Sequence, residues 1–130
     1  MLDTNICIYI AKHQPLSVMK KFQYLKPDQA VMSFITFGEL VFGAQKSQHK
    51  QQALAKLQQL RQIIPVIQSK KGLGETYGSI RAALERQGTP IGCNDNWIAA
   101  HALAENYILV TNNTCEFLRI PQLKVENWVD

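Results

Sequence analysis

The stretch Met1-Leu2-Asp3-Thr4-Asn5-Ile6-Cys7-Ile8-Tyr9-Ile10 places one carboxylate, Asp3, between an apolar start and an apolar helical run. This order predicts a strand, a short loop and a helix. Ligands bind beyond the carboxyl ends of the strands in open α/β sheets, so Asp3 lies where a ligand or a metal ion would bind. Alternatively, Asp3 or Thr4 only caps the helix, because both side chains can accept hydrogen bonds from its free N–H groups.

Outward from this stretch, short apolar segments alternate with helical patterns. Strands are predicted at residues 30–33, 63–67, 107–110 and 124–128, and Pro65 favours an edge position for the second of these. Helices are predicted after Pro15 and at residues 34–44, 47–62, 73–87 and 97–104, with one helical turn at 116–118. The helices between 34 and 62 should form an αα-hairpin. The alternation predicts an α/β fold with a parallel sheet covered by helices on both faces, in a single domain of residues 1–130.

The composition is that of an ordinary globular protein, with 46% hydrophobic and 18% charged residues. Cys7, Cys93 and Cys115 form no Cys-x-x-Cys pair, which argues against a disulfide framework and a zinc ribbon and indicates the reducing cytoplasm. No apolar run approaches the roughly 20 residues of a membrane span, so no membrane association is expected. The formal charge of +4 favours an anionic partner.

Two further acids lie on predicted helices. Glu39 shares a helix face with Ile35 and Phe42, and an ionised carboxylate on an apolar face is costly unless it is paired or binds a metal. A partly exposed Glu39 at the edge of that face is the alternative. Asp95 begins the side of its helix that continues with Ile98, although an acid in a first helical turn can also be only a cap.

Glu116 follows the predicted strand at 107–110, in the loop at its carboxyl end, and Asn113 lies closer to that strand. Glu116 completes a set of four acids with Asp3, Glu39 and Asp95. Clustered carboxylates raise one another's pKa unless a hard cation neutralises them. Ligands that are all oxygen, with no His or Cys at metal spacing, favour Mg²⁺ or Mn²⁺ over Zn²⁺.

These acids lie in four stretches: Met1-Leu2-Asp3-Thr4-Asn5, residues 33–43, Pro90 to Ala102, and Val110-Thr111-Asn112-Asn113-Thr114 to Phe117. In combination and order they resemble the PIN-domain ribonuclease toxins of bacterial VapBC toxin-antitoxin modules. The likeness covers nearly the whole chain. It implies a three-layer, Rossmann-like fold with a mainly parallel central sheet, a metal-dependent endoribonuclease acting on structured RNA such as tRNA, a homodimer, and a VapB-type antitoxin that blocks the site.

Carried over residue by residue, the resemblance implies a catalytic site of Asp3, Glu39 and Asp95, with Glu116 or Asn113 as the fourth member. We expect Asp3, Asp95 and Glu116 to hold Mg²⁺, while Glu39 completes the ligand set or orients the attacking water. Hydrogen bonds from Thr4, Asn5, Thr111 and Asn113 should hold the carboxylates in place. Lys46, Lys50, Arg81 and Arg86 are the expected RNA-binding cations, because 12 of the 14 basic residues lie between Lys12 and Arg86.

Two positions depart from the family pattern. Position 115, usually Arg, is Cys, and position 96, where an apolar residue is expected, is Asn. A catalytically weak or inactive PIN-like domain that binds RNA or a partner is therefore the main alternative. An aspartyl phosphohydrolase is disfavoured because Asn5 stands where a second Asp is needed. A dinucleotide binder is disfavoured because Gly72-Leu73-Gly74 is spaced one residue too far from Gly78.

Overall fold

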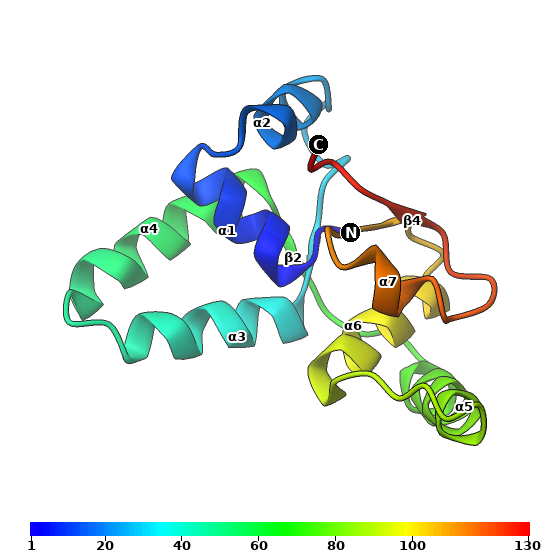
Figure 1. Ribbon diagram of the computed structural model, residues 1–130. Coiled ribbons are helices and arrows are strands. Elements are labelled where there is room, and N and C mark those ends of the chain that lie inside the picture. The colour runs from blue at the N-terminus through cyan, green and yellow to red at the C-terminus, as the bar shows by residue number, and fades with distance from the viewer.

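A computed structural model describes residues 1–130, and in it helices pack on both sides of a group of short parallel strands (Figure 1). The helices are α1 (Thr4–Lys12), α2 (Leu16–Gln23), α3 (Phe34–Gln45), α4 (Lys50–Ile63), α5 (Leu73–Arg86), α6 (Cys93–Ala104) and α7 (Thr114–Phe117). The strands are β1 (Met32–Ser33), β2 (Val66–Ile67), β3 (Leu109–Val110) and β4 (Val125–Glu126).

The opening residues occupy the middle of the sheet. β1 pairs in parallel with β2, and β3 pairs in parallel with β4. Leu2 joins the two pairs, because it forms a parallel bridge with Val110 and its N–H donates to the Val31 carbonyl at 2.8 Å. The order across the sheet is therefore β2, β1, residues 1–3, β3, β4, which confirms the parallel sheet and puts β2, with its preceding Pro65, at an edge.

This order contains a switch point. From residues 1–3 the chain first adds β1 and β2 on one side and then crosses to add β3 and β4 on the other. The carboxyl ends of residues 1–3 and of β3 are neighbours at this point, which is where open α/β sheets bind ligands. Asp3 is the last residue of the first segment and Thr111 follows β3, and both are buried.

Two hydrophobic clusters cover the two faces of the sheet. Successive strand residues alternate between them: Met1, Val31 and Leu109 lie in one cluster, and Leu2, Met32 and Val110 in the other. This alternation follows from the two-residue period of a strand. The first cluster packs against α5, α6 and α7, and the second against α1, α2 and α4, so the three-layer prediction is confirmed.

Local signals account for the helix ends. The Ser33 side chain accepts a hydrogen bond from the Ile35 N–H at 3.1 Å and caps α3, as its place in the sequence predicts. Helix α5 is followed by Gly88 at φ 71°, a left-handed conformation that glycine adopts without strain. Helices α3 and α4 form the expected hairpin, visible along the lower left of Figure 1. Every helix of the structure is too short or too polar to cross a bilayer.

Candidate active site

The four predicted acids project from four different elements at the carboxyl ends of the strands. Asp3 follows the central strand segment, Glu39 lies in α3, Asp95 lies in the first turn of α6, and Glu116 lies in α7 beyond β3. The sheet order explains the gathering, because each of these elements begins at or beyond the same edge of the sheet.

Asp3 is only 5% exposed, and it both caps a helix and faces the other acids. Its Oδ1 accepts a hydrogen bond from the Ile6 N–H at 3.0 Å, so the capping interpretation is correct for one of its two oxygens. Burial raises the pKa of Asp3 and nearby Glu39 raises it further, whereas hydrogen bonds from Thr111 and from the Ile6 and Asn5 backbone lower it.

Glu39 is held from α1. The Thr4 hydroxyl donates a hydrogen bond to Glu39 Oε1 at 2.6 Å, which ties Glu39 to the residue next to Asp3. The sequence argument for Glu39 was partly wrong, because Phe42 is 62% exposed and marks no buried face. The buried side of α3 instead carries the small residues Thr36 and Ala44, and Glu39 is half-buried beside them.

Asp95 and Glu116 are joined by a hydrogen bond. Burial, followed by the charges of Glu116, Asp3 and Glu39 and a hydrogen bond with Glu116, raises the pKa of Asp95 to about 6. All three other acids thus act electrostatically on Asp95. Glu116 is fixed on its other side by Asn113, whose Nδ2 donates to Glu116 Oε2 at 3.0 Å.

Three of the four expected supporting residues reach the acids with their side chains. Thr4 contacts Glu39, Thr111 contacts Asp3, and Asn113 contacts Glu116. Asn5 is the exception, because its side chain is exposed and makes no hydrogen bond. As the second residue of α1 it contributes its backbone N–H to Asp3 instead, so Asn5 supports Asp3 from the main chain.

The donor chemistry of this cluster fits a hard divalent cation. Asp3, Glu39, Asp95 and Glu116 together offer only carboxylate oxygens, the ligands that such cations prefer. No three His, Cys, Asp or Glu side chains converge closely enough to hold an ion as they stand. An ion at this cluster would require the carboxylates to rotate toward it, and relief of their mutual repulsion would favour that rotation.

Comparison with known proteins places the chain in a family. The model of the PIN domain matches residues 1–123. The chain belongs to the PIN-domain family. This PIN-domain chain is 42% identical over 129 residues to Ribonuclease VapC1 of Haemophilus influenzae strain R2866, covering 98% of the chain and 96% of that relative. It is also 42% identical over 128 residues to the tRNA(fMet)-specific endonuclease VapC of Shigella flexneri, with 98% and 96% coverage.

Solved structures give the same assignment. The PIN-domain chain superposes on VapBC-1 from nontypeable Haemophilus influenzae with a TM-score of 0.92 and 40% identity, covering 100% of this chain and 98% of that one. VapBC2 from Rickettsia felis, bound to a DNA fragment from their promoter, gives a TM-score of 0.91 and 41% identity, with 99% and 98% coverage. The α/β fold class and the predicted resemblance to VapC-type ribonucleases are both confirmed.

The four basic residues predicted to bind RNA fall into two separate groups in the PIN domain. Lys46 and Lys50 are exposed at the turn between α3 and α4, with Lys46 Nζ 4.4 Å from the Phe42 ring centroid. Arg81 and Arg86 lie on α5, on the other side of the molecule (Figure 1). Arg81 also pairs with Glu85 at 3.1 Å, so part of its charge is already neutralised.

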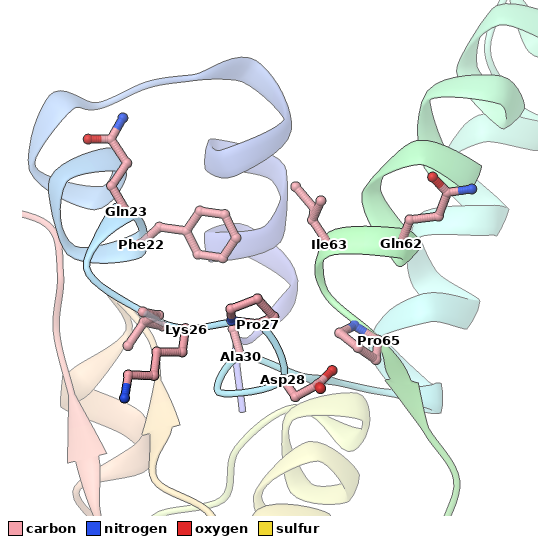
Figure 2. A pocket seen from close by; sticks show the side chains of 10 residues that line it. Phe22, Gln23, Lys26, Pro27, Asp28, Ala30, Gln62, Ile63 and Pro65 are labelled. Atoms are coloured by element: carbon pink, nitrogen blue, oxygen red, sulfur yellow. The ribbon is translucent and has the colours of Figure 1, made fainter.

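Two larger hollows were not predicted from the sequence. A groove of about 600 Å³ between α1, α3 and α4 is lined by Thr4 and Glu39 at the acidic cluster and by Lys12 and Lys56 farther out. A second pocket, of about 410 Å³, lies between the end of α2 and the end of α4 and contains none of the four acids (Figure 2). The groove lies where α1 meets the hairpin of α3 and α4, and this contact between segments distant in sequence leaves no local pattern.

Proposed function

We propose that this PIN-domain protein is an Mg²⁺-dependent endoribonuclease toxin of a type II toxin-antitoxin module, acting in the cytoplasm on structured RNA, with tRNA as the first candidate. The four carboxylates gathered at the switch point of the sheet carry this proposal, since burial and the charges of the other three acids together raise the pKa of Asp95 to about 6. Clustered acids of this kind are typical of divalent-metal sites. Relatives named Ribonuclease VapC1 and tRNA(fMet)-specific endonuclease VapC support the reaction class.

The residues of this chain would share the work as follows. Asp3, Asp95 and Glu116 hold Mg²⁺, or Mn²⁺ in its place, which would polarise the scissile phosphate and lower the pKa of a bound water. Glu39, anchored by Thr4, orients the attacking water or completes the ligand set. Thr111 and Asn113 keep Asp3 and Glu116 directed toward the site. Water adds to phosphorus and the bond to the leaving ribose oxygen breaks, so the products are two RNA fragments.

The partners follow from the same family. The solved relatives VapBC-1 from Haemophilus influenzae and VapBC2 from Rickettsia felis support a VapB-type antitoxin for this chain. The homodimer is a further part of the proposal. Light scattering of the purified protein tests the dimer. Capture of the product of a neighbouring small reading frame by this chain, with loss of nuclease activity on binding, tests the antitoxin.

A domain that binds RNA or a partner without cleaving is the second candidate. Two observations favour it: no three acids converge as they stand, and Cys115 replaces the Arg usual beside the site. In the first candidate the four acids are required for RNA cleavage, whereas in the second the protein binds RNA or a partner and the acids cleave nothing.

A ribonuclease assay on total RNA, with mapping of the cleaved ends, decides between the candidates. We expect cleavage in Mg²⁺ or Mn²⁺, no cleavage in EDTA, and loss of at least about a hundredfold in rate for Asp3→Asn and for Asp95→Asn. Asp28→Asn, an exposed acid outside the cluster, is the matched control and should cleave normally. Full activity of either site variant would reject the assignment, and RNA binding without cleavage would establish the second candidate.

A further inference from the structure

A second polar cluster is centred on two fully buried side chains, His101 and Ser33. His101 of α6 is 0% exposed, and so is Ser33 at the end of β1. Ser33 Oγ lies 2.7 Å from His101 Nδ1, and His101 Nε2 lies 3.3 Å from the Gln68 carbonyl oxygen just beyond β2. The Glu105 carboxylate contacts the same Nε2 without an aligned hydrogen bond. These four residues are called the His101 network below.

For a neutral ring, the hydrogen bonds favour one of the two tautomers. Ser33 Oγ already accepts the Ile35 N–H that caps α3, so its own proton is free to be donated to His101 Nδ1. Nδ1 is then an acceptor, and the ring proton resides on Nε2, which faces the Gln68 carbonyl and the Glu105 carboxylate. Each polar ring atom has a partner in this tautomer, as buried polar groups require.

The order Ser33, His101, Glu105 has the residue types of a hydrolytic triad, but its burial excludes that role. A nucleophilic Ser must reach a substrate carbonyl, and Ser33 has no exposed surface. Its hydroxyl is also engaged twice, as a helix cap and as a donor to the ring. The His101 network therefore has a structural role rather than a catalytic one.

Its place in the fold indicates what it acts on. Ser33 and Gln68 end or follow the neighbouring strands β1 and β2, and His101 spans both from α6. Glu39 lies six residues after Ser33 on α3, and Asp95 lies six residues before His101 on α6. At 1.5 Å per residue, each acid is about 9 Å along its own helix from this link. One buried contact thus joins the two helices that carry Glu39 and Asp95.

We propose that His101 is a positioning residue, which through its bond to Ser33 sets the placement of α3 relative to α6 and hence of Glu39 relative to Asp95. The consequence for the metal site rests on the proposed metal-dependent function. The effect of His101 on the placement of α3 relative to α6 does not depend on that function. Protein interiors are closely packed and transmit strain, so the loss of one buried contact is felt by its neighbours. We therefore expect a small shift of α3 relative to α6 when the bond between Ser33 and His101 is removed. Carboxylates that must turn toward an ion are sensitive to displacements of that size.

Distance measurement between spin labels on α3 and α6 tests the geometric part without metal or RNA. Gly38→Cys provides a label on α3, where an added side chain meets nothing within 4 Å, and the native Cys93 provides one on α6. Cys115→Ser removes the other exposed thiol, and Cys7 is buried. His101→Leu fills the space without hydrogen bonds, and His101→Asn keeps an acceptor in place of Nδ1. Val18→Ala, at a fully buried position on α2, controls for lost stability.

We expect His101→Leu to broaden or shift the distance distribution, and His101→Asn and Val18→Ala to retain the native one. An unchanged distribution in the Leu variant, an Asn variant that behaves like Leu, or an equal change in Val18→Ala would each overturn the proposal. Should His101→Leu not fold, His101→Gln, which reaches Gln68 but offers Ser33 no acceptor at the Nδ1 position, takes its place with the same expected shift.

Mn²⁺ affinity of the unlabelled proteins, followed by electron paramagnetic resonance, gives the functional readout. His101→Leu should weaken Mn²⁺ binding by about tenfold, the lower end of the range for residues that support metal ligands, and His101→Asn should retain most of the affinity. Absence of Mn²⁺ binding in the native protein would reject the metal site of the proposed function, while the label distances would still decide the role of His101.

Discussion

At the scale of single residues, the acidic cluster makes the metal-free protein sensitive to pH. The pKa of Asp95 rises to about 6 from its ordinary 3.8, so the folded state binds this proton more tightly than the unfolded state. The resulting stability is present below about pH 4 and is lost as pH rises through 6. In EDTA, we expect the free energy of unfolding to fall over this window by about 1–3 kcal/mol, with solvent screening favouring the lower end.

Denaturant titrations in EDTA between pH 4 and 7 measure this decrease. Asp95→Asn should flatten the profile and be more stable than the native protein at pH 7, whereas Asp28→Asn should follow the native profile. Saturating Mg²⁺ should abolish the decrease, because the cation stabilises the ionised carboxylates. An Asp95→Asn variant less stable than the native protein at pH 7 in EDTA would contradict the repulsion on which the site assignment rests.

Asn96 is the second residue with a measurable consequence. It is 3% exposed, its Oδ1 has no hydrogen-bond partner, and its Nδ2 makes only a long bond of 3.4 Å to the Ile91 carbonyl. A buried acceptor without a partner costs free energy, so Asn96→Leu should raise the free energy of unfolding by about 1–2 kcal/mol. A cavity of about 100 Å³ beside Asn96 gives the larger side chain room.

Urea denaturation of Asn96→Leu beside Asn94→Leu provides the comparison. Asn94 is exposed two residues earlier on α6, so its replacement should bring no gain. Equal stability changes in the two variants would show that the buried Oδ1 has found a partner, such as an ordered water. The sequence singled out Asn96 as a departure from an apolar pattern, and the unpaired oxygen explains why that departure matters.

At the scale of elements, the sequence predicted order and type better than extent. Every predicted strand is present, but each pair of strands is joined over only two residues. A hydrophobic run in the sequence indicates which residues are buried, whereas the length of a strand depends on its pairing with a neighbour. Helix α6 begins at Cys93 rather than at Trp97, since polar residues in a first turn resemble a loop in sequence. The bond between Ser33 and His101 spans 68 residues, and no local pattern can announce a contact of that length.

RNA binding tests the roles of the exposed helix charges. In Ca²⁺, RNA affinity should fall steeply with salt, and neutralising Lys46 with Lys50, or Arg81 with Arg86, should flatten the slope by about 1 for each phosphate that the protein no longer neutralises. We expect a smaller effect for the α5 pair, because Arg81 already pairs with Glu85. Cys115→Arg should strengthen binding, since a guanidinium beside the site can bind a phosphate through two hydrogen bonds.

Replacing Lys20 and Lys21 on α2 by Gln removes the same number of charges elsewhere and serves as the control. If the slope and affinity respond equally to all the paired substitutions, net charge alone attracts RNA. If no substitution changes them, the predicted RNA-binding residues are wrong, and the metal chemistry is unaffected.

At the scale of the whole molecule, the proposal predicts toxicity. Expression without an antitoxin should arrest bacterial growth, because hydrolysis of a tRNA stops translation, and the Asp3→Asn variant should not arrest growth at the same soluble protein level. Growth curves with quantified expression measure both. Normal growth in the presence of soluble native protein would favour the non-catalytic alternative.

The central position of residues 1–3 constrains when the protein can complete its fold during synthesis. Leu2 is paired on one side with Val31 and on the other with Val110, so the first strand made borders one of the last. A nascent chain that has emerged only as far as α6 lacks β3 and α7, so Asp3 has no Thr111 and Asp95 has no Glu116 beside it. Pairing between such distant residues is also slow to form. Because the acidic site includes Asp3 from the first strand and Glu116 from α7, we expect it to form only after α7 has been synthesised.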